Sequence, residues 1–297
     1  MFNVGVDFQL WYPGEESWEL WVVEKGKGGV VETLPSGSPL RFRALPKLKR
    51  VLALPTSALI ALPFISRAVD SKGLVQSAQM QVEKQGVGCD SLGIHVEPVC
   101  GSPPQTLARI DAPLLKADLL YQTDPAPDYI IAAATMMPLR PNSAAIWTEL
   151  GQNVIAFENN GHTVFYDKLS SDGGDLVDEA FRLTYQLSGE KLIQRVDGLT
   201  IWNRVSPEPF EERFQVPVAW EPRPEPSAIN LAQASLSPSW FRASQENQVS
   251  AKRKRGLFMV LGGVLGLILL GLISLVAFQL LQKNALKKEF ARLKPQA

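Results

Sequence analysis

The sequence contains few of the residues that usually carry metal binding, disulfide chemistry or acid–base catalysis. It has two cysteines and two histidines in 297 residues. Cys89, Cys100 and His95 together fall one ligand short of a four-ligand zinc site, so we predict free thiols and no metal centre or disulfide framework. His162 has no carboxylate or cysteine close to it in sequence, and we expect it to be structural.

An excess of charge of either sign is also missing. The 30 basic and 30 acidic residues give a formal net charge of +0. This balance leaves no large electrostatic field of the kind that proteins use to attract nucleic acid. We therefore expect no nucleic-acid partner, and we expect the basic residues to cluster only around the apolar segment near the C-terminus.

The short motifs that identify common enzymes are absent. The chain has no G-x-x-x-x-G-K-[ST] phosphate-binding loop, no H-E-x-x-H zinc motif and no G-x-S-x-G nucleophile motif. No other catalytic arrangement is evident, and we predict that the protein is not an enzyme.

A long apolar run is present at residues 256–278, GLFMVLGGVLGLILLGLISLVAF, which has no charged residue. As a helix with a rise of about 1.5 Å per residue it measures about 35 Å, longer than the roughly 30 Å hydrocarbon core of a bilayer. We predict a single membrane span. Gly262 and Gly266 form a G-x-x-x-G pattern, which favours close packing between membrane helices and a homo-oligomer.

The orientation of the predicted span follows from its flanks. A basic anchor, Lys252, Arg253, Lys254 and Arg255, precedes the span and by the positive-inside rule places residues 1–255 in the cytoplasm. The other flank is also basic, and the lack of an N-terminal secretion signal decides between the two. We expect a single-pass protein of the inner (cytoplasmic) membrane with a cytoplasmic N-terminal domain.

Periodicity and turn residues predict a mixed α/β fold before the span. We expect one helix from the cap Asp70 to Gly86 and another behind Asp172, ending at Gly189. An Asn159-Asn160-Gly161 turn predicts a hairpin between residues 153–158 and 162–169. The expected strands are a meander over 2–8, 18–24 and 29–34, adjacent strands at 51–54 and 58–62, a strand at 130–134, another at 146–150, and a final pair at 191–196 and 199–205. Residues 87–128 give no clear pattern.

The meander-then-helix order occurs twice, which predicts two lobes with weak internal repetition. Prolines and serines dominate after Arg204 and are typical of an extended tether. We predict four parts: a folded domain at 1–205, a Pro/Ser-rich linker at 206–251, the basic anchor and span at 252–281, and a short amphipathic tail at 282–297.

The stretch SDGGD at 171–175 has two interpretations. Gly173 and Gly174 at the start of a helix would leave backbone N–H groups free to bind a phosphate. Asp172 and Asp175 would repel a phosphate unless a magnesium ion intervened, and a plain Asp cap explains the same residues.

Residues 146–181, IWTELGQNVIAFENNGHTVFYDKLSSDGGDLVDEAF, resemble the second lobe of the actin-like platform proteins of type IV pili and type II secretion systems, the PilM/GspL type. VGVD at 4–7 and the stretch at 52–87 are similar to parts of the first lobe. The resemblance implies an actin-like, ribonuclease H-like, two-lobed cytoplasmic domain. It places Asp7, Glu149, Gly151, Gly173 and Gly174 at nucleotide-binding positions.

The sequence departs from the nucleotide-binding members at two motifs. Asp7 is followed by Phe8 and Gln9 where those members have Asp-x-Gly, and the second Asp-x-Gly is replaced by Glu149-Leu150-Gly151. The nucleotide pocket is therefore expected to be degenerate, with no bound cofactor, although ATP with magnesium is the alternative.

What the resemblance implies is an inner-membrane assembly-platform scaffold that docks a cytoplasmic motor ATPase and joins other inner-membrane platform proteins. Two further hypotheses remain open: a membrane-tethered actin-like ATP-binding protein, and a single-pass signalling or regulatory protein.

Overall fold

The structure is a computed structural model of the chain, which divides into two compact units, residues 1–242 and 243–297. The residues it describes are 7–24, 27–45, 47–86, 93–102, 105–114, 123–170, 173–193, 195–202, 207–227, 235–238, 241–242, 272, 274, 281–284 and 286–288. Within these ranges, no helix has both the length and the apolar character needed to cross a bilayer.

Several predictions for the C-terminal part fall outside this description. The span predicted at 256–278 lies outside it apart from positions 272 and 274. The anchor Lys252 to Arg255 and the glycine pair Gly262 and Gly266 lie outside it entirely.

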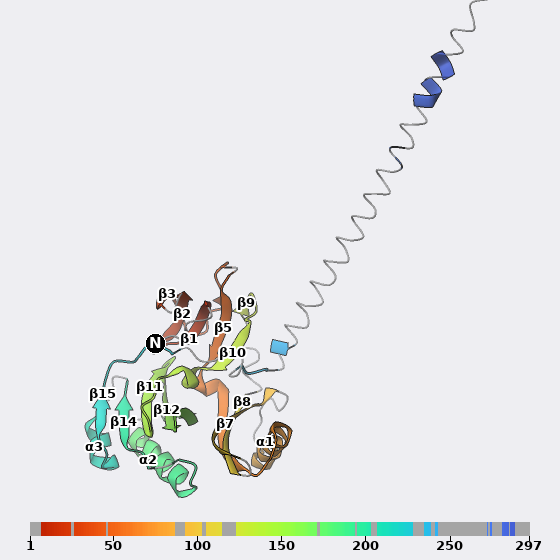
Figure 1. The fold of residues 1–297 in the computed structure, drawn as a ribbon. Coiled ribbons are helices and arrows are strands. Elements are labelled where there is room, and N and C mark those ends of the chain that lie inside the picture. The colour runs from red at the N-terminus through yellow and green to blue at the C-terminus, as the bar shows by residue number, and fades with distance from the viewer. Residues whose placement is uncertain are drawn as a thin grey trace, which may run out of the picture. The chain divides into compact units, whose positions relative to one another are not determined.

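The first sheet has five strands in the order β10-β5-β1-β2-β3 (Figure 1). β1, β2 and β3 form the predicted antiparallel meander, and β5 and β10 continue the sheet in parallel. The first strand of the described residues begins at Phe8, and residues 2–6 of the strand predicted at 2–8 lie outside the description. The strands are β1 (Phe8–Pro13), β2 (Ser17–Glu24), β3 (Lys27–Pro35), β5 (Lys49–Leu54) and β10 (Tyr129–Ala132); β4 (Leu40–Arg41) pairs with β9 (Thr123–Asp124) beside it.

The second sheet repeats this topology in the order β13-β12-β11-β14-β15. β11, β12 and β13 form an antiparallel meander, and β14 and β15 continue it in parallel. The predicted internal repetition is therefore confirmed as two sheets with the same strand order and directions, and one hydrophobic core cluster includes residues of both. Its strands are β11 (Ser143–Glu149), β12 (Gln152–Asn159), β13 (His162–Lys168), β14 (Gly198–Ile201) and β15 (Val218–Trp220).

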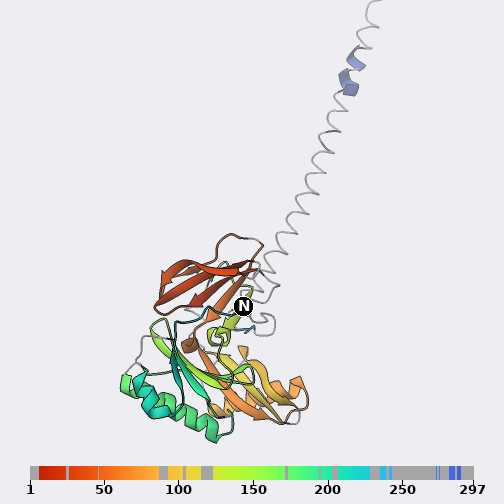
Figure 2. The ribbon, with the colours of Figure 1, turned by 60° about the vertical axis from the view of Figure 1, so that its left-hand side comes forward.

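The chain between β5 and β10 includes a third sheet, β6-β8-β7, drawn in orange to yellow in Figure 2. It consists of β6 (Leu59–Ser66), β7 (His95–Ser102) and β8 (Gln105–Pro113). Residues 95–102 and 105–113, from the part of the chain that gave no clear sequence pattern, form the antiparallel pair β7 and β8. The prediction that strands 51–54 and 58–62 are neighbours is wrong, because Pro55 and the 3-10 turn η1 (Thr56–Ala58) carry the chain from the first sheet into the third.

Helices α1 (Ser71–Gln85) and α2 (Gly173–Gly189) confirm the two predicted helices. The Asp70 carboxylate accepts a 2.7 Å hydrogen bond from the Gly73 N–H, and Gly86 ends α1 with a φ of 64°. These are the expected cap and C-terminal glycine. The buried face of α1 is narrow: Ala78 and Val82 are buried against the third sheet, while Val75 is 43% exposed.

The region predicted as a linker begins with ordered structure that belongs to the folded unit. Helix α3 (Glu208–Phe214) buries Phe210 and Phe214, and Phe214 packs edge-on against Phe181 of α2 at a ring distance of 5.5 Å. β15 then pairs with β14. The partner predicted for β14 was the segment at 191–196, and no strand occurs at its described residues, 191–193 and 195–196. Prolines in this region lie at the ends of short helices and strands. Phe210 and Phe214, one helical turn apart, form the buried face that packs α3 onto the folded unit.

Candidate functional site

The two sheets meet at equivalent turns. The turn between β11 and β12 donates two backbone hydrogen bonds to the turn between β1 and β2: Leu150 N–H to the Gly14 carbonyl and Gly151 N–H to the Glu15 carbonyl, both at 2.7 Å. Leu150 and Gly151 have φ values of 49° and 80°. Two successive left-handed residues are typical of a two-residue hairpin turn, and this conformation makes both N–H groups available to the other sheet.

Glu149 fastens the same junction from the end of β11. It is 1% exposed, and its Oε2 accepts a 2.6 Å hydrogen bond from the backbone N–H of Thr56, while its Oε1 accepts one of 3.0 Å from the indole N–H of Trp147. Burial raises the pKa of Glu149 to about 7, although these two hydrogen bonds oppose the shift. Both carboxylate oxygens are thus occupied by protein donors.

Tyr12 and Arg223 complete the polar groups of the junction. The Tyr12 hydroxyl donates to the Ala133 carbonyl at 3.3 Å, and burial, followed by the charge of Glu149, raises the pKa of this phenol. Arg223 Nη2 lies 2.5 and 2.7 Å from the two carboxylate oxygens of Glu19, and its guanidinium carbon lies 5.7 Å from the Tyr12 ring centroid. The region predicted as a linker therefore contributes to the junction.

The structure brings together some of the predicted nucleotide-binding residues and separates others. Glu149 and Gly151 lie at the junction. Asp7 precedes β1, whereas the junction turn follows β1; a six-residue strand, about 20 Å long, separates them. Gly173 and Gly174 begin α2, and no hydrogen bond links them to Glu149 or Gly151 among the residues described.

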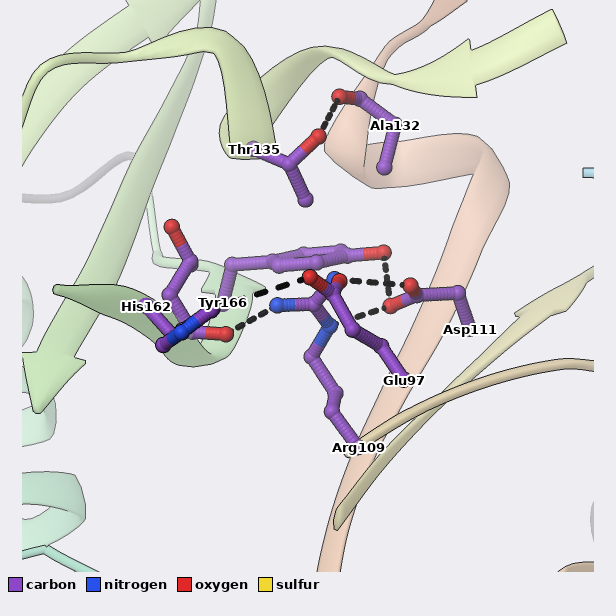
Figure 3. Close-up of polar contacts among 8 residues, drawn as sticks. Glu97, Arg109, Asp111, Ala132, Thr135, His162 and Tyr166 are labelled. Atoms are coloured by element: carbon purple, nitrogen blue, oxygen red, sulfur yellow. Dashed lines mark hydrogen bonds and ion pairs between the residues drawn. The ribbon is translucent and has the colours of Figure 1, made fainter. Parts of the chain in front are cut away.

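A second polar cluster, centred on Arg109 of β8, joins the third sheet to the second (Figure 3). Arg109 is 1% exposed and binds the Asp111 carboxylate at two points, 2.7 and 2.9 Å, and Glu97 Oε2 at 2.5 Å. It also donates to the Thr163 carbonyl of β13, and Tyr166 of β13 donates to Asp111 Oδ1 at 2.7 Å. We call these five residues the Arg109 cluster.

The charges of the Arg109 cluster stabilise one another. Burial alone would lower the pKa of Arg109, but the carboxylates of Asp111 and Glu97 outweigh it and leave this pKa above its usual value. His162, predicted to be structural because no carboxylate or cysteine lies close to it in sequence, lies 3.8 Å from Glu97 Oε1. The sequence signal that was missed is the spacing of Arg109 and Asp111, which places both side chains on one face of a strand.

His95, Glu97 and Asp111 have ligand atoms within 4.8 Å of one another, a spacing compatible with a metal ion. Arg109 already binds both carboxylates of this group. A divalent cation there would have to lie beside a buried guanidinium, so the chemistry of these donors fits an ion-pair network better than a metal site. Cys100 is a free thiol, as predicted, and Cys89 lies outside the residues described.

No protein-family model matches the chain. No curated protein matches it either.

Solved structures do match. One is the cytoplasmic domain of EpsL, an inner-membrane component of the type II secretion system of Vibrio cholerae: 10% identity, 81% of this chain and 95% of that chain, TM-score 0.46. Another is the PilM–PilN type IV pilus biogenesis complex: 8% identity, 73% of this chain and 88% of that chain, TM-score 0.48.

Proposed function

We propose that the protein is a non-enzymatic scaffold of a type II secretion or type IV pilus machine, held in the inner membrane by its C-terminal segment. Its folded N-terminal unit would dock the cytoplasmic motor ATPase and bind other inner-membrane platform proteins. The resemblance of residues 146–181 to the second lobe of such platform proteins supports this class of function. The apolar run at 256–278, directly preceded by the basic anchor Lys252 to Arg255, supports the membrane attachment.

The observation that carries the scaffold proposal is the direct hydrogen bonding between the two junction turns. Backbone N–H groups in tight turns are the groups that cradle phosphates in nucleotide-binding proteins. Here the N–H groups of Leu150 and Gly151 donate to carbonyls of the opposite turn, and Glu149 is occupied by Thr56 and Trp147. A phosphate entering between the turns would have to break these bonds, which favours a fixed body over a nucleotide switch.

The positions of the predicted nucleotide-binding residues support the same proposal. Asp7 lies at the opposite end of β1 from Glu149 and Gly151, so the three do not form one metal–phosphate site. Glu149, which lies at the junction, is buried, and burial favours its neutral form. A neutral carboxyl is a poor ligand for magnesium.

Two measurements on the full chain in a neutral detergent test the proposal. Affinity purification from native membranes, followed by mass spectrometry, should recover a motor ATPase and inner-membrane platform proteins. A membrane protein of similar abundance carrying the same tag is the control. Recovery of signalling proteins without a motor would favour the regulatory alternative.

Calorimetry with ATP and magnesium separates the scaffold from the nucleotide-binding alternative. We expect no binding, and the tryptophan fluorescence spectrum would show that the sample is folded. Micromolar binding that Glu149→Ala weakens would overturn the scaffold proposal in favour of an ATP-binding protein.

A further inference from the structure

A pocket of about 570 Å³ opens at the end of the first sheet where β5 begins. Its wall combines the loop before β5 with Pro125 and Asp128, which precede β10. The third sheet follows the other end of β5, and the junction turn follows the other end of β1. The pocket is therefore separate from both the sheet junction and the Arg109 cluster.

Four cationic side chains line this pocket: Arg43, Lys47, Lys49 and Arg50. They come from a stretch of unusual charge, because no acidic residue occurs between Glu32 and Asp70 while six basic residues do. The expectation that basic residues cluster only around the apolar C-terminal run is wrong on this point. A chain with no net charge thus concentrates positive charge at one concave place.

Asp128, the acidic residue of the lining, neutralises one of these cations. Asp128 Oδ1 accepts a 3.0 Å hydrogen bond from Arg50 Nη2. Asp128 Oδ2 accepts two more, one of 3.3 Å from Arg50 Nε and one of 2.8 Å from the Arg50 backbone N–H. Burial raises the pKa of Asp128, but the hydrogen bonds from Arg50, with the charges of Arg50 and Lys49, outweigh this and leave it below its usual value. Asp128 is therefore ionised, its hydrogen bonds go to Arg50, and Lys49 acts on it through its charge without a hydrogen bond.

The other cations are less compensated. Arg43 lies 3.4 Å from Glu32, with both side chains more than a third exposed, so this pair is weak. Lys47 and Lys49 form no ion pair with any residue that the structure describes. Concave surfaces of one sign concentrate the field and attract a ligand of the opposite sign.

The pocket also offers apolar contacts. Leu45 is 38% exposed, and Leu48, Ala44 and Pro125 add further apolar wall. A bare inorganic anion would leave this surface unused. A peptide with carboxylates and an apolar side chain would use both the lysines and the apolar wall.

We propose that this pocket binds an acidic segment of a protein partner, with carboxylates at Lys47 and Lys49 and an apolar side chain against Leu45. This proposal is based on the charged and apolar residues that line the pocket, and it does not depend on the identity of the motor ATPase.

The test uses the full chain in a neutral detergent and the fluorescein-labelled peptide EELDEL as the probe. Fluorescence anisotropy should show binding at least about tenfold tighter than that of the neutral peptide QQLNQL, because lost ion pairs of this kind cost about that much. Higher ionic strength should weaken the binding. Equal affinity for the two peptides, or no binding of either, overturns the proposal.

Amine acetylation followed by mass spectrometry locates the bound peptide without any substitution. The peptide should slow acetylation of Lys47 and Lys49 and leave Lys72 and Lys84, two exposed lysines of α1, unchanged. Equal protection of all four lysines would mean non-specific attraction and would count against the pocket.

Matched double variants complete the test. Lys47→Glu with Lys49→Glu should weaken peptide binding by about tenfold or more, whereas Lys72→Glu with Lys84→Glu, the same change in net charge, should leave it within about twofold. Thermal midpoints of both variants show that they fold. Short-chain phosphatidylglycerol is tested in the same way. If this lipid binds at Lys47 and Lys49 and the peptide does not, the pocket binds a lipid headgroup, and the proposal of a protein partner is overturned.

Discussion

Glu149 and Thr56 are 93 residues apart in the chain, and the Glu149 carboxylate accepts a 2.6 Å hydrogen bond from the Thr56 backbone N–H. Both residues are buried. The bond connects the last residue of β11 to the turn that leads from the first sheet to the third. It makes the ionisation of one carboxyl group part of the stability of the sheet junction.

The first prediction concerns pH. The folded state raises the pKa of Glu149 from 4.5 to about 7 and so binds this proton more tightly than the unfolded chain does. The stability from this group is fully present below about pH 4.5 and is lost as the pH rises to about 7, a change of about 3 kcal/mol. Glu149→Gln should remove this pH dependence.

Tryptophan fluorescence during urea unfolding at a series of pH values measures this effect, because all seven tryptophans lie within residues 1–242. The variant should be less stable at low pH, since the amide N–H₂ cannot accept from Trp147 or Thr56. An equal decline in stability with pH for variant and wild type would contradict the assignment to Glu149.

The second prediction concerns the Arg109 cluster. Arg109→Met leaves the Asp111 and Glu97 carboxylates without their buried cation and should lower the free energy of unfolding by about 3 to 5 kcal/mol. The control is Arg140→Met, which removes the exposed Arg140–Glu221 ion pair and should cost less than about 1 kcal/mol. Similar losses in both variants would mean that the cluster contributes no more than a surface pair.

The third prediction concerns the junction turn. A Cβ atom at Gly14 would lie 2.6 Å from the Ser17 carbonyl and would also contact the Glu19 carboxylate, so Gly14→Ala must displace the turn that accepts from Leu150. We expect a loss of about 1 to 3 kcal/mol. At Gly29 of β3 a Cβ atom meets nothing within 4 Å, and Gly29→Ala should leave the stability unchanged or raise it slightly. A harmless Gly14→Ala would show that the turn has room that the structure does not indicate.

The fourth prediction concerns the end of the folded unit. A chain ending at residue 205 lacks the buried Phe210 and Phe214, strand β15 and the Arg223–Glu19 ion pair. Burying two phenylalanines stabilises by about 4 kcal/mol in total. Residues 1–205 should therefore unfold about 10 °C below residues 1–242, or aggregate. Equal thermal midpoints would restore the domain boundary that composition alone predicts.

Local sequence signals predicted the elements that depend on neighbouring residues. The cap Asp70, the terminal Gly86 and the Asn160-Gly161 turn each act within a few residues, and the structure confirms α1 and the β12–β13 hairpin. Segments whose partners are distant were harder to predict. Residues 95–102 and 105–113 contain prolines and a register shift between Pro98 and Cys100, and pairing in the third sheet makes them strands.

The composition after residue 205 predicted a linker, whereas the structure has helix α3 and strand β15 there. Prolines at 207, 217, 222 and 224 suggested a tether, but burial of Phe210 and Phe214 outweighs their effect. The contribution of Phe214 to stability depends on its ring contact with Phe181, which lies about thirty positions earlier in the chain, on α2.

The sequence by itself determined the elements with local causes, the repeated meander-and-helix order, the apolar run at 256–278 and the resemblance to platform proteins of secretion and pilus machines. Tertiary structure alone decided which residues meet. It placed Asp7 at the opposite end of β1 from Glu149 and Gly151, bonded the junction turns to each other, buried Arg109 between two carboxylates, and gathered Lys47 and Lys49 in a pocket with Arg50 and Asp128. The physical reason is that hydrogen bonds, ion pairs and burial act over a few ångströms in space, and the fold sets those distances between residues that are far apart in the chain.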